Sequence, residues 1–456
     1  MSGPLTRTMA LALGAALLVV NLAEAKPAKL TADQLLAFGA QALSQGYADQ
    51  ALSIAQALLQ RDGHDSSAYA LQAQALRVLQ RLPESAAAAH LAWTYAKNAP
   101  QRYEAATVLA QALSLQDHRT MAQFWLRQAV QNAPNGAAQR QALQDFAYVR
   151  SQNPLSLQVD ASIRPSNNVN GGARDPLFEF LGIPFILSGD ALALSGLNWG
   201  VGVQGRYTLA ESDTTATKLT FAGSEQGVIL SDAAHAQAPF ARNADYALGN
   251  VEVGIEHAGA LNLGPVASTL TTSLTAGHSW YGGRDLANSL TLGADLGLPL
   301  AGSQATLSAS LTRQNRLDRA LSSSSEAEVG LDLVQAGPTG DRWQEGVSVR
   351  RVVSDDIGID HAEATLSLDW QARHPVAGFA LGAGLSLRGA DYGHSFYSGH
   401  GRQDVRWAAS LSATLDQITY LGFSPVLSLE FARNNSNISL YDTQTVGIGL
   451  SVRSRF

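Results

Sequence analysis

The sequence predicts a two-domain protein in which an α-helical, tetratricopeptide-like solenoid precedes an antiparallel transmembrane β-barrel of about 14 strands. Two observations lead to this prediction. Helical periodicity in an Ala-, Leu- and Gln-rich segment gives way near Asn153 to Gly-, Ser- and Thr-rich segments in which apolar and polar residues alternate. The chain also ends on an alternating strand, which puts Ile448, Leu450 and Phe456 on one face and glycine, serine and arginine on the other.

Residues 1–25 have the pattern of a secretory signal peptide. Arg7 precedes an apolar run, residues 9–22, and Ala23-Glu24-Ala25 has the small-x-small form of a cleavage site. We expect cleavage before Lys26, and a retained membrane anchor is the less favoured alternative because the run is short. The chain contains no cysteine, which leaves neither a lipid-attachment cysteine nor a disulfide. The mature protein is therefore expected to be exported and not to be a lipoprotein itself.

Residues 26–153 are expected to form a periplasmic helical repeat domain. Apolar residues such as Leu35, Phe38 and Ala42 recur at helical spacing. Residues 95–100 and 129–134 resemble each other at the tetratricopeptide period, which predicts roughly three helix pairs. Stacked pairs of this kind usually expose a binding groove. A packed bundle that only spaces or plugs the barrel is the alternative.

Residues 154–456 are expected to form the outer-membrane barrel. Short connections near residues 211–213 and 417–419 alternate with longer ones such as residues 165–191, as periplasmic turns and outer loops do in such barrels. The clearest strand, residues 361–374, alternates an apolar face with a polar one. Four polar residues of this strand are predicted to face the lumen: Glu363, Asp369, Gln371 and Arg373.

Four segments of the barrel region carry a family resemblance: residues 163–170, 181–191, 422–425 and 433–442. They are similar to the surface lipoprotein assembly modulators, or Slam family. The resemblance implies a periplasmic tetratricopeptide-like domain joined to a barrel of about 14 strands that moves client proteins or lipoproteins to the cell surface. The terminal Phe456 likewise resembles the barrel-insertion signal that the outer-membrane insertion machinery reads.

The first loop of the barrel is a candidate gate or client-contact loop. It holds large apolar residues, Phe178, Phe180 and Phe185, in a connection that ought to be solvated, so something must cover them. One interpretation is a plug or client-contacting gate folded into the lumen. The equally weighted alternative is a self-packed outer hairpin or a continuation of the flanking strands. Three asparagines of the same loop are most simply turn formers: Asn167, Asn168 and Asn170.

The sequence contains no phosphate loop, no metal-spaced Cys/His cluster and no zincin helix. We therefore assign no catalytic, cofactor-binding or metal-ligating residue and expect neither an enzyme activity nor a cofactor. His394 and His400 bracket a Gly-rich loop, where two histidines are more often solvent-facing than metal ligands. The net charge of −7 offers no basic patch for nucleic acid.

Together these patterns predict an outer-membrane translocator with its N-terminal domain in the periplasm. Its expected partners are a client protein or lipoprotein encoded nearby, periplasmic chaperones, the outer-membrane insertion machinery, and lipid with lipopolysaccharide. One alternative is an exopolysaccharide export porin with a periplasmic helical scaffold, which predicts an aromatic and charged ladder along the lumen. Another is a passive porin, which predicts ion conductance without any protein client.

Overall fold

The computed structural model describes residues 30–180, 183–264 and 266–454. The predicted signal peptide, residues 1–25, and Phe456 lie outside the described residues. The chain divides into two compact units, Met1–Lys97 and Asn98–Phe456. Within the described residues, the first unit contains four helices, and the second contains three helices followed by the barrel and its loops.

Helical repeats precede the barrel, as predicted. Helix pairs start at Ala32, Ser66 and Ala99, about 34 residues apart, which is the tetratricopeptide period. The described residues hold seven helices ahead of the first strand: α1 (Ala32–Ser44), α2 (Ala48–Arg61), α3 (Ser66–Val78), α4 (Leu82–Tyr95), α5 (Ala99–Leu115), α6 (Arg119–Asn132) and α7 (Gly136–Gln152).

Small residues allow the helices of the first unit to pack closely. A Cβ atom at position 39 would lie 2.3 Å from Leu71, so the close approach of α1 and α3 requires glycine there. The buried Ser85 hydroxyl donates to the Ala73 carbonyl oxygen at 2.7 Å, which fastens α4 to α3. Asp65 caps α3 by accepting from the backbone N–H groups of the first turn, and these N–H groups have no partner inside the helix. The alanine-rich composition thus becomes a set of close helix–helix contacts.

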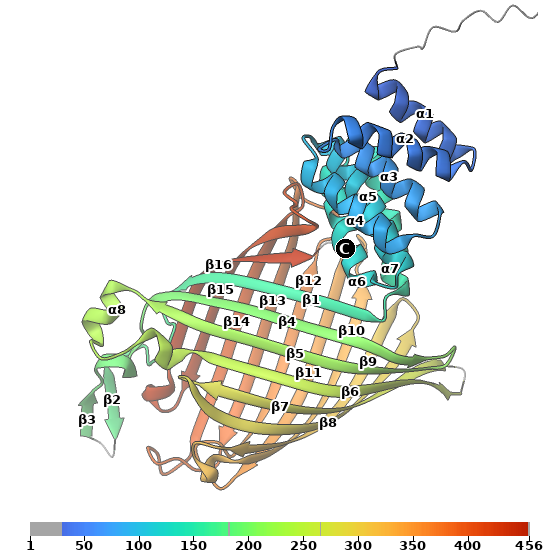
Figure 1. Cartoon of the computed structure of the whole chain (residues 1–456). Coiled ribbons are helices and arrows are strands. Elements are labelled where there is room, and N and C mark those ends of the chain that lie inside the picture. The colour runs from blue at the N-terminus through green and yellow to red at the C-terminus, as the bar shows by residue number, and fades with distance from the viewer. Residues whose placement is uncertain (1–29, 181–182, 265, 455–456) are drawn as a thin grey trace, which may run out of the picture. The chain divides into compact units, whose positions relative to one another are not determined.

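A closed antiparallel barrel of fourteen strands follows, which confirms the predicted fold class (Figure 1). Strand β1 pairs with β4 on one side and with β16 on the other, and every other strand pairs with its sequence neighbours. The wall strands are β1 (Leu155–Ser166), β4 (Gly196–Glu211), β5 (Thr215–Leu230), β6 (Leu248–Leu263), β7 (Val266–Tyr281), β8 (Arg284–Leu300), β9 (Ser303–Arg316), β10 (Ser324–Ala336), β11 (Arg342–Ser354), β12 (His361–Gln371), β13 (Phe379–Tyr392), β14 (Arg402–Leu415), β15 (Phe423–Ser436) and β16 (Thr443–Ser454).

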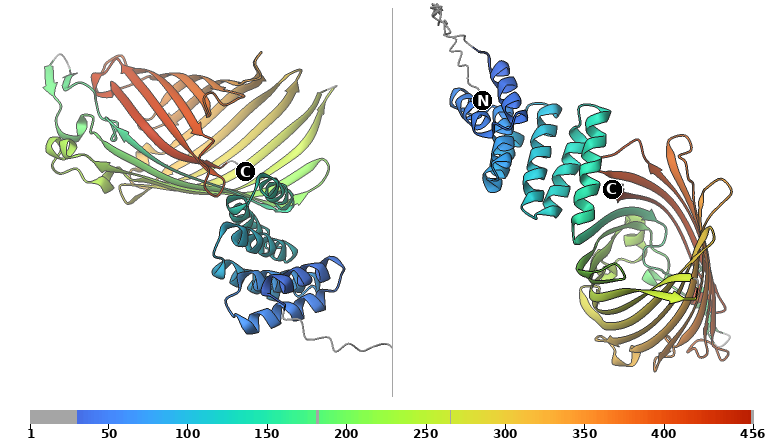
Figure 2. Two further views of the ribbon diagram at one scale, coloured as in Figure 1. Left: turned by 90° about the horizontal axis from the view of Figure 1, so that it is seen from above. Right: turned by 90° about the vertical axis from the view of Figure 1, so that its right-hand side faces the viewer.

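The two ends of the barrel differ. One, the loop end, carries the two longest connections, residues 167–195 and 231–247. These hold the hairpin β2 (Leu177–Phe180) and β3 (Ile183–Ile186) and the short helix α8 (Asp232–Gln237), which lie beyond the same end of the wall (Figures 1 and 2). The other, the turn end, carries short turns such as residues 301–302, and an even number of strands returns residues 154 and 454 to it.

Strand β12 is shorter than the sequence pattern suggests. Alternation predicted a strand from residue 361 to 374, whereas β12 ends at Gln371. Asp341 of the neighbouring turn explains this difference. Its carboxylate accepts from the Arg373 backbone N–H at 2.9 Å and from Trp370 Nε1 at 3.2 Å, which draws the chain out of the ladder.

Candidate functional site

The outer wall of the barrel is an apolar belt. Each of the fourteen strands contributes at least one large aliphatic side chain that is 39–59% exposed. A set with one residue per strand, from β1 to β16 in order, is Val159, Val203, Leu219, Ile255, Leu274, Leu292, Leu311, Leu331, Val347, Leu366, Leu385, Leu411, Leu427 and Ile448. Such a continuous exposed belt on a closed sheet suits hydrocarbon and not water.

Tryptophans mark both borders of the belt. Trp280 near the loop end donates from Nε1 to Glu225 at 3.0 Å. Trp343 and Trp370 face each other near the turn end, with ring centroids 6.4 Å apart. Tryptophan prefers the border between hydrocarbon and water, so these positions agree with a membrane-spanning wall.

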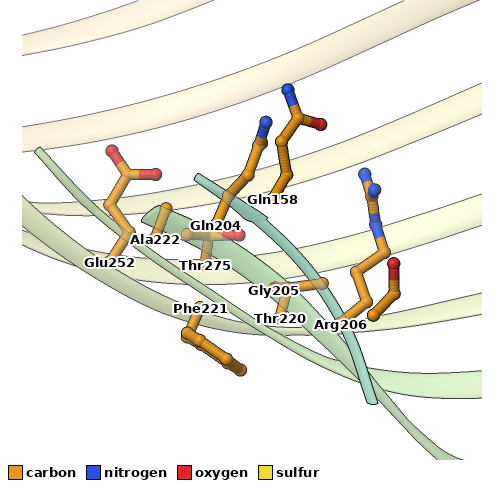
Figure 3. Close-up of a pocket in the computed structure, with 10 residues that line it drawn as sticks. Gln158, Gln204, Gly205, Arg206, Thr220, Phe221, Ala222, Glu252 and Thr275 are labelled. Atoms are coloured by element: carbon orange, nitrogen blue, oxygen red, sulfur yellow. The ribbon is translucent and has the colours of Figure 1, made fainter. Parts of the chain in front are cut away.

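The inner face of the wall is polar. Figure 3 shows a hollow of about 150 Å³ in this face, into which Gln158, Gln204, Arg206 and Glu252 reach from neighbouring strands. Phe221 points the other way, and its ring covers Gly205 on the outer face. Along β5 the change of face from one residue to the next follows from strand geometry alone.

Three of the four polar residues predicted to face the lumen lie on β12 at alternate positions: Glu363, Asp369 and Gln371. Asp369 and Gln371 line a hollow of about 320 Å³ toward the turn end. Glu363 lies near the loop end and is surrounded by cations. Its oxygens are 2.7 Å from Arg350 Nη2 and 3.4 Å from Arg388 Nη1. Arg373 lies beyond the strand, in the turn.

Charges are unevenly distributed around the lumen. The lumen face of β6 to β10, which Arg316 at the end of β9 shares, carries six carboxylates: Glu252, Glu256, Asp295, Glu326, Glu328 and Asp332. The opposite wall, from β11 through β16 to β1 and β4, carries most of the cations: Arg350, Arg388, Arg406, Arg453, Arg164 and Arg206. Matching strand registers place all of these residues on one face of the sheet. The lumen is therefore crossed by an electric field.

The predicted gate residues Phe178, Phe180 and Phe185 come together in the β2–β3 hairpin, at the loop end. The rings of Phe178 and Phe180 stack with centroids 6.4 Å apart, and Phe185 lies opposite Phe178 across the hairpin. Phe178 is buried, whereas Phe185 is 46% exposed. The hairpin is a sheet of its own, separate from the barrel wall.

A series of aromatic contacts joins this hairpin to the lumen. The Tyr397 ring lies edge-on to Phe178 at 5.3 Å and is 6.3 Å from the Tyr441 ring. The buried Arg402 guanidinium lies between Tyr441 and Tyr392, at 3.9 and 3.4 Å from their ring centroids. We call these residues, Phe178, Tyr397, Tyr441, Arg402 and Tyr392, the aromatic bridge.

The bridge continues into the charged cluster of the lumen. The Tyr392 ring stacks on His361 at 4.6 Å, and His361 Nε2 is 3.5 Å from Glu363. Arg402 Nε is also 3.3 Å from the Asp404 carboxylate. The hairpin and Glu363 are therefore connected by side chains in van der Waals or polar contact throughout.

The three predicted asparagines fasten the first loop to its neighbours. Asn167 donates its backbone N–H to the Val446 carbonyl at 3.3 Å, and its side chain accepts from the Val446 N–H at 2.7 Å. Asn168 is buried and donates to the Gln444 carbonyl at 3.3 Å. Asn170 bonds the backbone of the same loop at 2.7–2.9 Å. Two of the three thus bind the last strand.

Helix α6 is attached to the turn end of the barrel. Arg127 donates to the Leu421 carbonyl at 3.0 Å and to Ser454 Oγ at 3.1 Å. Its guanidinium also lies 5.1 Å from the ring centroids of both Phe146 and Phe423. These contacts connect the helical part of the second unit to the last turn and the last strand of the barrel.

Sequence reasoning missed the aromatic bridge and Arg127. Tyr441 lies within a segment that carried the family resemblance, and Tyr397 lies in the loop considered for its histidines. No local pattern marks Arg402 or Arg127, because Tyr441, Leu421 and Ser454, which they contact, are distant in sequence. In the part of the chain that the structure describes, no group of three or more His, Cys, Asp or Glu residues is placed to hold a metal ion. None of the described helices is long and apolar enough to span a membrane.

Residues 303–456, a range that includes β9 to β16, match the family model described as surface lipoprotein assembly modifier. The match confirms the family resemblance for this part of the chain and includes both segments near its end, residues 422–425 and 433–442. No curated protein matches the chain.

Solved structures resemble the two regions separately. Acinetobacter baumannii OccAB2 is 10% identical with a TM-score of 0.35, over 65% of this chain and 97% of that one. A bacterial polysaccharide outer membrane secretin is also 10% identical, with a TM-score of 0.34 over 65% of this chain and 98% of that one. The TPR2B domain of yeast Sti1, in its pHsp70 complex, is 21% identical, with a TM-score of 0.25 over 27% of this chain and 98% of that one.

A closed sheet with an apolar outer face and a polar lumen satisfies its backbone hydrogen bonds within the wall and offers lipid a hydrocarbon surface. The chain is therefore an outer-membrane β-barrel that follows a tetratricopeptide-like helical region.

Proposed function

We propose that this protein is a non-enzymatic translocator that delivers client lipoproteins or proteins to the cell surface. In this proposal the loop end faces the cell exterior, and the turn end and the helices face the periplasm. The helices take up the client or its chaperone, and the lumen guides the polypeptide outward. The matched family description, surface lipoprotein assembly modifier, supports this class of role.

The observation that carries the proposal is the exposed apolar hairpin at the loop end. Leu177 and Ile186, which pair across the hairpin, are 61% and 79% exposed, and Ile183 opposite Phe180 is 59% exposed. Phe178, on the other face of β2 from Leu177, is buried. Exposed apolar surface costs about 25 cal/mol per Å² relative to burial, so a protein retains such a patch when a partner covers it. A client that emerges from the lumen is a partner at the right end of the barrel.

The lumen favours a polypeptide over a polysaccharide. Carboxylates on one wall and arginines on the other suit a chain that carries both signs of charge. A sugar-binding ladder needs aromatic rings along the path. In the described strands, lumen-facing aromatic rings occur near the loop end, at Tyr281 and Tyr392, and the remaining lumen positions are polar, aliphatic or glycine. The polysaccharide porin is thus the weaker candidate.

A passive porin leaves the hairpin and the aromatic bridge without a role. It also predicts that conductance through the barrel in a planar bilayer is the whole activity. A translocator predicts in addition that a lipoprotein encoded beside this gene depends on the chain for surface exposure.

The test expresses such a lipoprotein with and without this chain and scores its protease accessibility on intact cells. The variant replaces Leu177 and Ile186, a cross-strand pair of the hairpin, with serine. The matched control is Phe240→Ser, which removes an apolar side chain that is 95% exposed in the other long loop of the same end. We expect the hairpin variant to lower client exposure severalfold and the control to leave it unchanged, with both barrels folded by heat-modifiable gel mobility.

Client exposure that does not depend on this chain contradicts the proposal. If polysaccharide export or solute uptake falls instead when the chain is removed, the cargo assignment is wrong. Equal effects of the two serine variants would place client contact elsewhere than on the hairpin.

A further inference from the structure

Among the described residues, the seam between β1 and β16 has the shortest ladder in the barrel wall. Strand β1 pairs with β4 through twelve residue pairs, and β15 pairs with β16 through twelve. Between β1 and β16 the described residues form three: Ser162 with Ser451, Ile163 with Leu450, and Ser166 with Gly447. A barrel is held closed by its ladders, so this seam is where the wall opens at least cost.

Pro165 accounts for one gap in this ladder. The Asn167 backbone N–H points to Val446 on β16, and residues two apart on a strand point the same way. The nitrogen of Pro165 therefore faces β16 without a hydrogen to donate. On the partner strand, Gly447 and Gly449 have no side chains to pack against β1.

The seam differs between its two halves. Toward the loop end it is closed by the three residue pairs and by the hydrogen bonds of Asn167 and Asn168 to β16. Arg164 also lies over the two glycines of β16 and reaches Glu430 on β15 at 2.9 Å. Toward the turn end, residues 155–161 of β1 have described ladder partners on β4 alone. Residue Ser454 of β16 is held there by Arg127 of α6.

Both chemical environments that a lipidated polypeptide needs meet at this seam. Leu157 and Val159 line it on the belt side, where they are 47% and 52% exposed. Arg164 and Arg453 lie beside it on the lumen side, by strand alternation. Opening the seam would therefore join the hydrocarbon of the membrane directly to the polar lumen.

We infer that the β1–β16 seam is a lateral passage for acyl chains, through which the lipid anchor of a client stays in the bilayer while its polypeptide moves through the lumen. Each methylene group that leaves hydrocarbon for a polar lumen adds to the cost of transfer, so a long acyl chain is excluded from the lumen. A slit in the wall removes this obstacle because the chain never leaves the membrane. The inference deepens the proposed function and rests on it for the identity of the cargo.

The test locks the seam with an engineered disulfide. Ser162 and Ser451 are direct partners, and antiparallel partners lie about 4.5–5.5 Å apart at Cα, within reach of a disulfide. The protein has no cysteine of its own, so the variant Ser162→Cys/Ser451→Cys forms one defined bond. The matched control, Ser367→Cys/Ser386→Cys, joins two lumen-facing serines across the fully paired β12–β13 ladder.

A phospholipid serves as the probe, because its polar headgroup would move through the lumen while its acyl chains stay in the membrane. The full-length protein is reconstituted in phosphatidylcholine vesicles that contain a short-chain fluorescent phosphatidylethanolamine. Transfer of this lipid between leaflets is followed by extraction into albumin, which is too large for the lumen. Small reductants such as dithionite are unsuitable, because they pass through an open barrel.

We expect wild-type protein, the reduced seam variant and the oxidised control to transfer the lipid about tenfold faster than protein-free vesicles, and the oxidised seam variant to lose this gain. Reduction of the same sample restores it, which separates locking from misfolding. Equal transfer by the oxidised and reduced seam variants overturns the inference, and so does wild-type transfer no faster than in protein-free vesicles. The assay contains no client, so its failure is distinct from failure of the proposed function.

Discussion

Replacing Leu366 with arginine tests which face of the wall meets lipid. Leu366 is the middle residue of β12, five residues from either end, and it is 54% exposed. Its cross-strand neighbours, Val347 and Leu387, belong to the same apolar belt. Arginine at the bilayer midplane of a barrel costs about 2–4 kcal/mol. The folding equilibrium in a membrane is therefore expected to fall by a factor of roughly 30 to 1,000.

The neighbouring residue provides the control. Ser367 faces the lumen between Gly346 and Ser386, and Asp369 lies two residues further along the same face. Arginine at position 367 points into water beside a carboxylate, so we expect Ser367→Arg to change the free energy of unfolding by less than about 1 kcal/mol.

Reversible urea unfolding in thin phospholipid vesicles, followed by tryptophan fluorescence, gives both values. The ratio between the two variants is the decisive quantity, since both add the same side chain one residue apart. Equal losses, or a larger loss for Ser367→Arg, would refute the orientation of β12 and with it the position of Glu363 and Asp369 in the lumen.

Two further changes test the ends of the barrel. Asp356 is buried in the loop between β11 and β12, and it accepts a hydrogen bond from the hydroxyl of Ser322 in the loop between β9 and β10. This bond, with the Gly358 N–H and nearby arginines, lowers the pKa of the Asp356 carboxyl below its ordinary value of 3.8. The carboxylate therefore stabilises the fold above about pH 4 and loses this effect as the pH falls through its folded pKa. Asp356→Asn should accordingly lower the free energy of unfolding by about 1 kcal/mol at pH 7 and by little near pH 3. Thermal unfolding against pH measures this, with exposed Asp355→Asn as the control, and a loss independent of pH would contradict it. At the turn end, Arg127→Ala removes two hydrogen bonds and two ring contacts. Backbone hydrogen exchange in residues 416–422 should therefore accelerate about tenfold. The control is Arg140→Ala on α7, an exposed position where the exchange rate should not change.

Most of the fold follows from signals that are local in the sequence. Alternation along residues 361–371 depends only on the period of a strand, and the helix pairs depend on the helical period and on caps such as Asp65. A closed barrel adds little that is non-local, because almost every strand pairs with its sequence neighbours. The early end of β12 is the exception, since Asp341 acts from a different turn.

The candidate site depends on contacts that no local pattern contains. Phe178 was noticeable as an apolar residue in a loop, but its partner Tyr397, and Tyr441 beyond it, lie in two other loops far along the chain. Arg402 is likewise an ordinary strand arginine until Tyr392 and Tyr441 enclose it. Loops from opposite ends of the barrel sequence meet because the wall closes on itself, and closure is a property of the whole sheet.

Several departures from barrel rules lie beside one another at the β1–β16 seam and in the first loop. A barrel built only for stability keeps proline and paired glycines out of its closing ladder and apolar strands out of water. This chain places Pro165, Gly447 and Gly449 at the one seam between its first and last strands, and the first loop runs directly from that seam to the exposed hairpin. The asparagines between them bind the last strand with hydrogen bonds that can break and re-form. A weak seam, a polar latch and an apolar hairpin that adjoin one another are what a wall requires if it has to open for a client and then close again.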